Sequence, residues 1–159
     1  MHFYIEHNFG HHLNVGTPED GATAKYNQTV YSFWWSSVTK QYFGAWKRQF
    51  ELLKAQKKGF LSLKNDVFWY HFIQAGYLFL VYYLFSSKVL LFAVVIGVLS
   101  FLFLETINYI EHYGLRRFKM SSGRYERVQP HHSWNSNFNI GRIVSVSYTH
   151  LTLPTIDPV

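Results

Sequence analysis

The sequence predicts an all-α integral-membrane protein with a two-span helical hairpin and histidine-bearing helices on the cytoplasmic side. Three observations support this class. The chain of 159 residues is 48% hydrophobic and only 15% charged. Between Val67 and Leu104 the only charged residue is Lys88. Nine histidines occur with no cysteine, which excludes disulfides and thiolate metal sites and directs a metal hypothesis to imidazole ligands.

The first segment, residues 1–65, is expected to be cytoplasmic and to begin with a histidine cluster. His7, His11 and His12 form the pattern H-x-x-x-H-H. On a helix, residues four apart lie on one face, so His7 and His11 can share a metal ion, and Glu6 is placed to orient a ring nitrogen. His12 projects roughly 100° away and suits a second metal. The alternative is a solvated polar face or a pH-sensitive patch.

The rest of this segment is expected to be helical. Thr17-Pro18-Glu19-Asp20 predicts a helix start, with Thr17 as N-cap, proline in the first turn and acids near the positive end of the dipole. An aromatic-rich stripe then repeats every four residues and predicts an amphipathic helix, either at the membrane interface or packed in the cytosol. Its members are Val30, Trp34, Val38, Tyr42 and Trp46.

Residues 66–112 are expected to form the transmembrane hairpin. One straight helix through the apolar stretch would measure about 57 Å, nearly twice the roughly 30 Å core of a bilayer. The polar break Ser86-Ser87-Lys88 instead predicts two spans, Val67–Phe85 and Val89–Leu104, the second continuing as a helix to His112. The alternative is a helical hairpin buried in a soluble core.

The basic residues predict the orientation of this hairpin. They flank it on both sides, whereas only Lys88 lies at the turn. The positive-inside rule therefore places both ends in the cytoplasm and the turn outside. A basic collar around apolar spans accounts for the formal charge of +6, so membrane lipid is an expected partner and nucleic acid is not.

A second candidate cluster lies at the end of the second span. Asn108 and His112 follow Glu105 by three and seven residues, so the three side chains share one helical face. Ionisable groups at membrane depth usually face a partner helix, a cavity or a metal. A polar stripe bonded to another helix is the alternative. Spacing alone assigns no role to His132, in the expected cytoplasmic segment 113–145.

These motifs carry a family resemblance. Residues 2–12, H-F-Y-I-E-H-N-F-G-H-H, resemble the second histidine box of the integral-membrane alkane 1-monooxygenases. Residues 108–115, N-Y-I-E-H-Y-G-L, resemble a further histidine-containing signature of that family. Residues 123–128 and 132–137, G-R-Y-E-R-V and H-S-W-N-S-N, resemble the segment that follows it. All occur in the family's order.

The resemblance implies two non-haem iron ions and hydroxylation of the terminal carbon of medium-chain alkanes. Dioxygen would be the oxidant, and electrons would come from NAD(P)H through a reductase and rubredoxin. Carried over residue by residue, it implies that His7, His11, His12 and His112 bind iron. Residues kept as candidates for orienting these ligands are Glu6, Glu105, Asn108 and His132.

Two other function classes stay open. A fatty-acyl desaturase or an aromatic side-chain hydroxylase of the same superfamily would share the histidine boxes. A non-enzymatic, histidine-rich membrane protein that binds a divalent metal is the alternative from a different class, although the apolar stretch offers only His71 and Gln74 as strong polar groups.

The resemblance also implies parts beyond this sequence. The family carries one histidine box that would precede Met1 and another that would follow about residue 145. The chain is therefore expected to be an internal fragment that cannot hydroxylate a substrate by itself. Residues 146–159 resemble the translation of a sequencing adapter, so this tail is expected to be non-native read-through and is excluded from the fold prediction.

Overall fold

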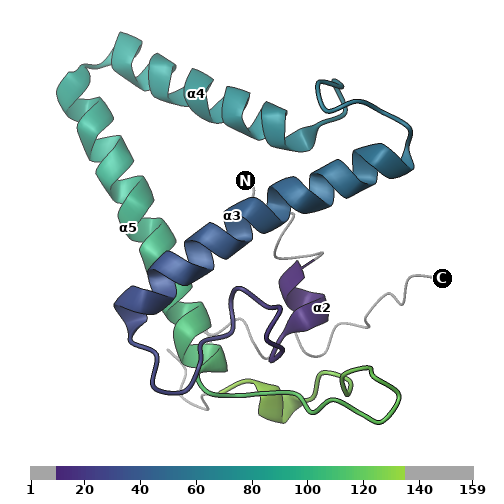
Figure 1. Ribbon diagram of the computed structural model, residues 1–159. Coiled ribbons are helices and arrows are strands. Elements are labelled where there is room, and N and C mark those ends of the chain that lie inside the picture. Colours follow the sequence, from purple (N-terminus) through teal and green to yellow (C-terminus); the bar gives the residue numbers. More distant parts are fainter. Residues whose placement is uncertain (1–9, 135–159) are drawn as a thin grey trace.

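The computed structural model describes residues 10–134 (Figure 1). The expectations for Glu6, His7 and the tail 146–159 lie outside the described residues. Within them the all-α prediction is confirmed, because the only β-type pairing is an isolated bridge between Lys119 and Tyr125. The helices are α2 (His12–Asn14), α3 (Val30–Ala55), α4 (Asp66–Leu84), α5 (Ser87–His112) and the 3₁₀ helix η2 (Pro130–His132).

The predicted helix start at residues 17–20 is wrong. The Thr17 hydroxyl donates a hydrogen bond back to the Asn14 carbonyl at 2.8 Å, and Asp20 accepts from the Ala22 amide at 3.0 Å. Such local side-chain bonds compete with a helix and favour turns. The helix begins at Val30 instead, where Thr29 is the N-cap and accepts from the backbone of Ser32.

Helix α3 buries a different stripe from the one that its aromatic residues predicted. The half-buried aromatics Trp34 and Trp46 lie beside the buried stripe. Each of the first four residues of the buried stripe stands one position before a residue of the predicted stripe. The Trp34 ring nitrogen donates to the Thr106 hydroxyl of α5 at 3.1 Å. Half of the buried stripe is polar, which a hydrophobicity pattern cannot reveal. Its members are Phe33, Ser37, Gln41, Ala45, Gln49 and Leu53.

The predicted break between two long apolar helices is confirmed. Helix α4 ends at Leu84 and α5 begins at Ser87, with the Ser86 hydroxyl capping α5. Figure 1 shows that α4 and α5 diverge from this short turn and that α3 runs between them as the third side of an open triangle. The α3–α4 corner is closed by Ala45 and Val67.

Helix α5 is the one described helix that is long and apolar enough to cross a membrane. Only 6% of its most apolar window is buried, whereas the core helix of a soluble protein would be mostly buried. This exposed apolar helix fits a membrane protein better than a helical hairpin buried in a soluble core. That α4 crosses as well remains a prediction.

The C-terminal end of α5 is contacted by two segments that are far apart in sequence. The backbone amide of Gly114 donates to Ala24 at 3.0 Å, and that of Arg117 donates to Gly16 at 2.8 Å. The Trp134 amide donates to Glu111, in the last turn of α5, at 2.7 Å. Residues 10–28 and 113–134 thus enclose the place where α5 ends at His112.

Candidate metal centre

The structure brings together the histidines of the two predicted clusters. His11 directly precedes α2, and His112 is the last residue of α5. Their ring centroids are 5.0 Å apart, and the rings of His11 and His12 are 5.9 Å apart. The end of a long helix and a short helical turn thus present three imidazoles to one region. His7 lies outside the described residues.

The ring of His11 is oriented by a buried carboxylate. Its Nδ1 lies 2.9 Å from Oδ2 of Asp20, and both residues are buried. Because a carboxylate only accepts, Nδ1 carries the hydrogen, and in the neutral ring the lone pair is then on Nε2. A ligating histidine that donates its other N–H to a carboxylate is typical of metal sites, where this contact fixes tautomer and orientation.

Asp20 is itself held in place. Besides the Ala22 amide, its carboxylate accepts from the Thr23 hydroxyl at 2.5 Å. Burial alone would raise the pKa of Asp20, but the charge of His11 and the hydrogen bonds from His11, Thr23 and Ala22 outweigh it and lower the pKa. Burial would lower the pKa of His11, but Asp20, with Glu111 and Glu105, raises it. Asp20 is therefore ionised when it holds His11.

His112 is oriented by a backbone carbonyl. Its Nδ1 lies 3.1 Å from the carbonyl oxygen of His132, so Nδ1 donates and Nε2 carries the lone pair. Oε2 of Glu111 lies 3.9 Å from this Nε2. His11 and His112 therefore present the same nitrogen, although one is held by a carboxylate and the other by a carbonyl.

The buried face of α5 continues the site away from His112. Glu105, Asn108, Glu111 and His112 are all buried, so the structure places the three predicted residues on one buried face. Oε1 of Glu111 is buried without a hydrogen-bond partner among the described residues, whereas the side chain of Asn108 interacts with the Glu105 carboxylate. Buried polar atoms are normally satisfied, so this Glu111 oxygen is placed to contact a further group.

Glu105 uses its carboxylate differently. Oε2 accepts from the Ser37 hydroxyl at 2.6 Å and Oε1 accepts from the Gln41 amide at 2.9 Å. Gln41 also donates to Ser37 at 2.7 Å, which closes a polar triangle between α3 and α5. Glu105 thus links α3 and α5 through these bonds. This arrangement matches the alternative given above, a polar stripe bonded to another helix.

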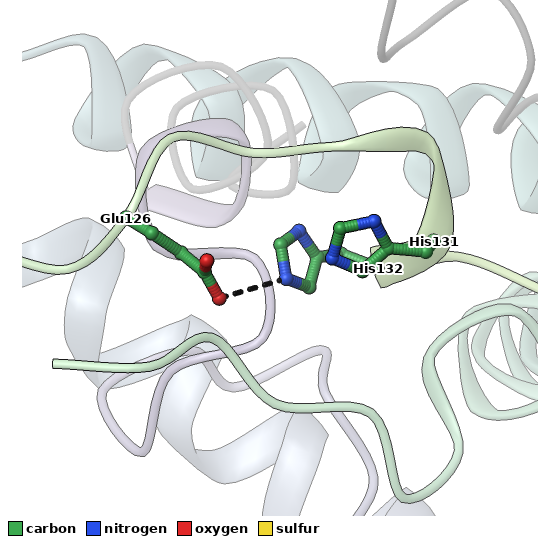
Figure 2. A group of neighbouring side chains, drawn as sticks. All are labelled: Glu126, His131 and His132. Carbon is green, nitrogen blue, oxygen red and sulfur yellow. Dashed lines mark hydrogen bonds and ion pairs between the residues drawn. The ribbon is translucent and has the colours of Figure 1, made fainter.

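His132 belongs to a separate group with Glu126 and His131, whose ligand atoms lie within 4.8 Å of one another (Figure 2). Nδ1 of His132 accepts from the Gln129 amide at 2.9 Å, so Nε2 carries the hydrogen and donates to Glu126 at 3.2 Å. Burial and the neighbouring His131 lower the pKa of His132 and keep its ring neutral. A metal ion on Nε2 of His132 would require removal of that hydrogen. The two hydrogen bonds of the His132 ring instead hold η2 in place, and the backbone carbonyl of His132 orients His112.

Sequence reasoning missed Asp20 and Glu111. The sequence predicts a helix start around Asp20, and no spacing rule connects Asp20 with His11 across an irregular loop. Glu111 follows Asn108 by three residues and extends the same face as Glu105, so helical spacing could have found it. The stabilising contacts of Arg117, described below, carry no local sequence signal either.

The donor set fits a transition metal such as iron. The rings of His12 and His112 each lie near the ring of His11. Nδ1 of His11 and Nδ1 of His112 are each engaged by an oxygen acceptor, and Oε1 of Glu111 is buried on the adjoining helix face without a hydrogen-bond partner among the described residues. Imidazole suits iron, copper, zinc and nickel, and the sequence offers no thiolate.

Curated relatives bear names of oxygen-inserting enzymes. Alkane 1-monooxygenase 2 of Pseudomonas aeruginosa is 40% identical over 136 residues, which cover 86% of this chain and 36% of the relative. Alkane 1-monooxygenase of Ectopseudomonas oleovorans is 37% identical over 90% of this chain and 36% of its own length. The xylene/toluene monooxygenase hydroxylase component of Pseudomonas putida is 30% identical over 92% of this chain and 38% of its length.

The chain spans little more than a third of the length of these relatives. A family model described as fatty acid desaturase matches residues 1–152, nearly the whole sequence. The matched range contains His7, His11, His12 and His112. The chain therefore belongs to the fatty acid desaturase family.

Proposed function

We propose that this chain is part of a membrane di-iron monooxygenase that hydroxylates the terminal carbon of medium-chain alkanes. The convergence of His11, His12 and His112 carries the proposal, because it joins two motifs that lie far apart in sequence. The names and similarity of the alkane 1-monooxygenases support the substrate class. His7, His11, His12 and His112 are the proposed iron ligands within this sequence.

In this proposal the residues of the chain position the ligands. Asp20 fixes the tautomer of His11, and the His132 carbonyl fixes that of His112. Iron supplies the activation of dioxygen that insertion of an oxygen atom into an unactivated C–H bond requires. The chain's own contribution is a constellation held by buried hydrogen bonds at the end of an apolar helix.

The proposed location is the bacterial inner membrane, with the centre at the cytoplasmic side. Basic residues follow α5 closely, including Arg116, Arg117 and Lys119, whereas Lys88 lies alone at the opposite end. This asymmetry supports a cytoplasmic position for His112. Rubredoxin and its NAD(P)H-dependent reductase are the proposed electron donors, and they would reach the centre from the cytosol.

Metal analysis and a substrate comparison test the proposal. The purified membrane protein that carries this chain is assayed with octane, a fatty-acyl thioester and xylene, using rubredoxin, its reductase and NADH. We expect two irons per protein and 1-octanol as the main product. Zinc alone, or turnover of the acyl thioester without octane oxidation, would contradict it.

The family description and one relative support a second candidate. The fatty acid desaturase description and the xylene/toluene monooxygenase favour a desaturase or an aromatic side-chain hydroxylase built on the same histidines. The same substrate panel distinguishes them, because the acyl thioester or xylene would then be the preferred substrate.

A further inference from the structure

We propose that Arg117 is a positioning residue that fixes the segment carrying His11 and His12 against the segment that orients His112. The inference rests on the proposed metal site. The Arg117 side chain donates to the carbonyls of Leu13 and Val15 at 2.9 and 3.2 Å, both from Nη1. Its Nε donates to the carbonyl of Glu126 at 2.7 Å.

The first two carbonyls belong to the end of α2. The last carbonyls of a helix have no partner within it, and a cationic side chain is well suited to satisfy them. Leu13 and Val15 closely follow His11 and His12 in the chain. Fixing these carbonyls therefore fixes the direction of the short helix and with it the directions of the two imidazoles.

The backbone of Arg117 strengthens this attachment. Its amide donates to the Gly16 carbonyl at 2.8 Å. Gly16 has φ of +73°, which favours glycine, and a Cβ there would lie 3.2 Å from Cγ of Arg117. Gly16 thus provides both the backbone conformation and the space that let the two segments approach closely.

The third carbonyl leads to His112. Glu126 accepts from Arg117 through its backbone, and its carboxylate accepts from the Phe118 amide at 2.8 Å and from His132. The His132 carbonyl in turn contacts Nδ1 of His112. Arg117 is therefore the side chain that joins the support of His11 and His12 to the support of His112.

The shape of the guanidinium is essential for this role. Its separate N–H groups reach three carbonyls in two directions, and it lies 6.0 Å from the centre of the Tyr125 ring. An ammonium group is a compact point charge without this fork. Lysine at residue 117 would keep the charge but lose part of the attachment.

The test compares Arg117→Gln and Arg117→Lys with Arg116→Gln in the purified membrane protein that carries this chain. Arg116 is the neighbouring exposed residue, so its substitution removes the same charge without touching these carbonyls. Hydrogen exchange of peptides covering Leu13–Gly16 reports on the attachment. The visible absorption of Co²⁺ added to the metal-free protein reports on ligand geometry.

We expect exchange at the Val15 and Gly16 amides to rise about tenfold in Arg117→Gln. The Co²⁺ bands should shift, and Co²⁺ affinity should fall about 10–100-fold. Arg117→Lys should show a smaller change, and Arg116→Gln should match the wild type. If Arg117→Gln does not fold, the lysine variant decides.

Each other outcome is informative. Faster exchange with unchanged Co²⁺ bands would show a purely structural role and overturn the proposal, as would unchanged exchange in both Arg117 variants. A wild-type protein that binds no Co²⁺ or iron would instead overturn the proposed function and the role of Arg117 in it. The exchange data would still show whether the attachment exists, so the two failures are distinguishable.

Discussion

At the scale of single residues, His11 and His112 present the same ring nitrogen but depend on different acceptors. Asp20 is a buried carboxylate, whereas the acceptor for His112 is a neutral carbonyl. A carboxylate partner makes an imidazole a more basic ligand than a carbonyl partner does. The two histidines are therefore expected to differ in how strongly they hold a metal.

Replacing Asp20 tests this difference. Asp20→Asn keeps the size of the side chain but removes the charge, so metal affinity should fall about 10–100-fold. Competition with a chelator of known affinity measures the change. The control is Glu19→Gln, on an exposed neighbour. Equal affinity in Asp20→Asn and the wild type would show that the carboxylate does not act on the metal through His11.

Glu126 gives a prediction on pH. The Phe118 amide and the neighbouring His132 and His131 lower the pKa of Glu126 below its ordinary value of 4.5, against a smaller opposing effect of burial. A lowered pKa contributes stability above the unfolded value, and this is lost as pH falls through the folded value. Wild type should therefore exceed Glu126→Gln in Tm at pH 6–7, and the difference should shrink below roughly pH 4.5.

Thermal unfolding between pH 3.5 and 7 measures this difference. Glu51→Gln, on an exposed position of α3, serves as the control and should show a smaller pH-dependent difference. A Glu126→Gln difference that is constant over the whole range would contradict the proposed contribution of its charge.

Residue-scale prediction from the sequence succeeded where a helix dictated the spacing. The offsets of three and seven placed Asn108 and His112 on one buried face. The sequence missed the role of Asp20, because its contact with His11 depends on how an irregular loop folds back. Contacts of that kind arise from tertiary structure and leave no periodic signal.

At the scale of the helices, the polar triangle of Ser37, Gln41 and Glu105 joins α3 to α5 in a buried place. Removing one partner of a buried network leaves the others unsatisfied. Glu105→Ala should therefore lower the free energy of unfolding by about 2–3 kcal/mol, and Glu105→Gln by less.

The thermal stability of the solubilised protein measures the effect of Glu105→Ala. Thr39→Ala is a matched control, because its hydroxyl donates within α3 to the Trp35 carbonyl at 2.7 Å and makes no bond to α5. Equal Tm values for Glu105→Ala and Thr39→Ala would show that the triangle adds little.

The helices show why a hydrophobic pattern predicts that a helix exists better than it predicts which face of the helix is buried. The break between α4 and α5 could be predicted because the polar residues 86–88 interrupt an apolar run. The buried stripe of α3 was misplaced by one position because it contains Ser37, Gln41 and Gln49, whose burial is satisfied by partners elsewhere in the chain. The aromatic side chains lie on the neighbouring, half-buried stripe, so the prediction chose that stripe instead.

At the scale of the whole molecule, α4 and α5 leave large apolar surfaces uncovered, including Phe72, Tyr83, Phe92 and Ile96. Apolar surface of this extent is normally covered by lipid or by further protein. The overall class followed from composition and from the nearly uncharged apolar run, whereas the open arrangement of the three long helices did not.

Cysteine labelling tests the orientation of the molecule, because the chain contains no cysteine of its own. Ser87→Cys, at the start of α5, should react with a membrane-impermeant maleimide in intact spheroplasts. Ser121→Cys, beyond the other end of α5, should react only after lysis. The reverse pattern would place the proposed centre on the opposite side of the membrane.

The position of His112 in the last turn of α5 has a consequence for how substrate and electron donor would reach the proposed centre. A hydrophobic substrate dissolved among the acyl chains would arrive along α5. A water-soluble reductase partner would approach from the aqueous phase at the end of this helix. The two would reach the centre by separate routes, so a high concentration of hydrocarbon in the bilayer would not obstruct electron transfer from the reductase partner.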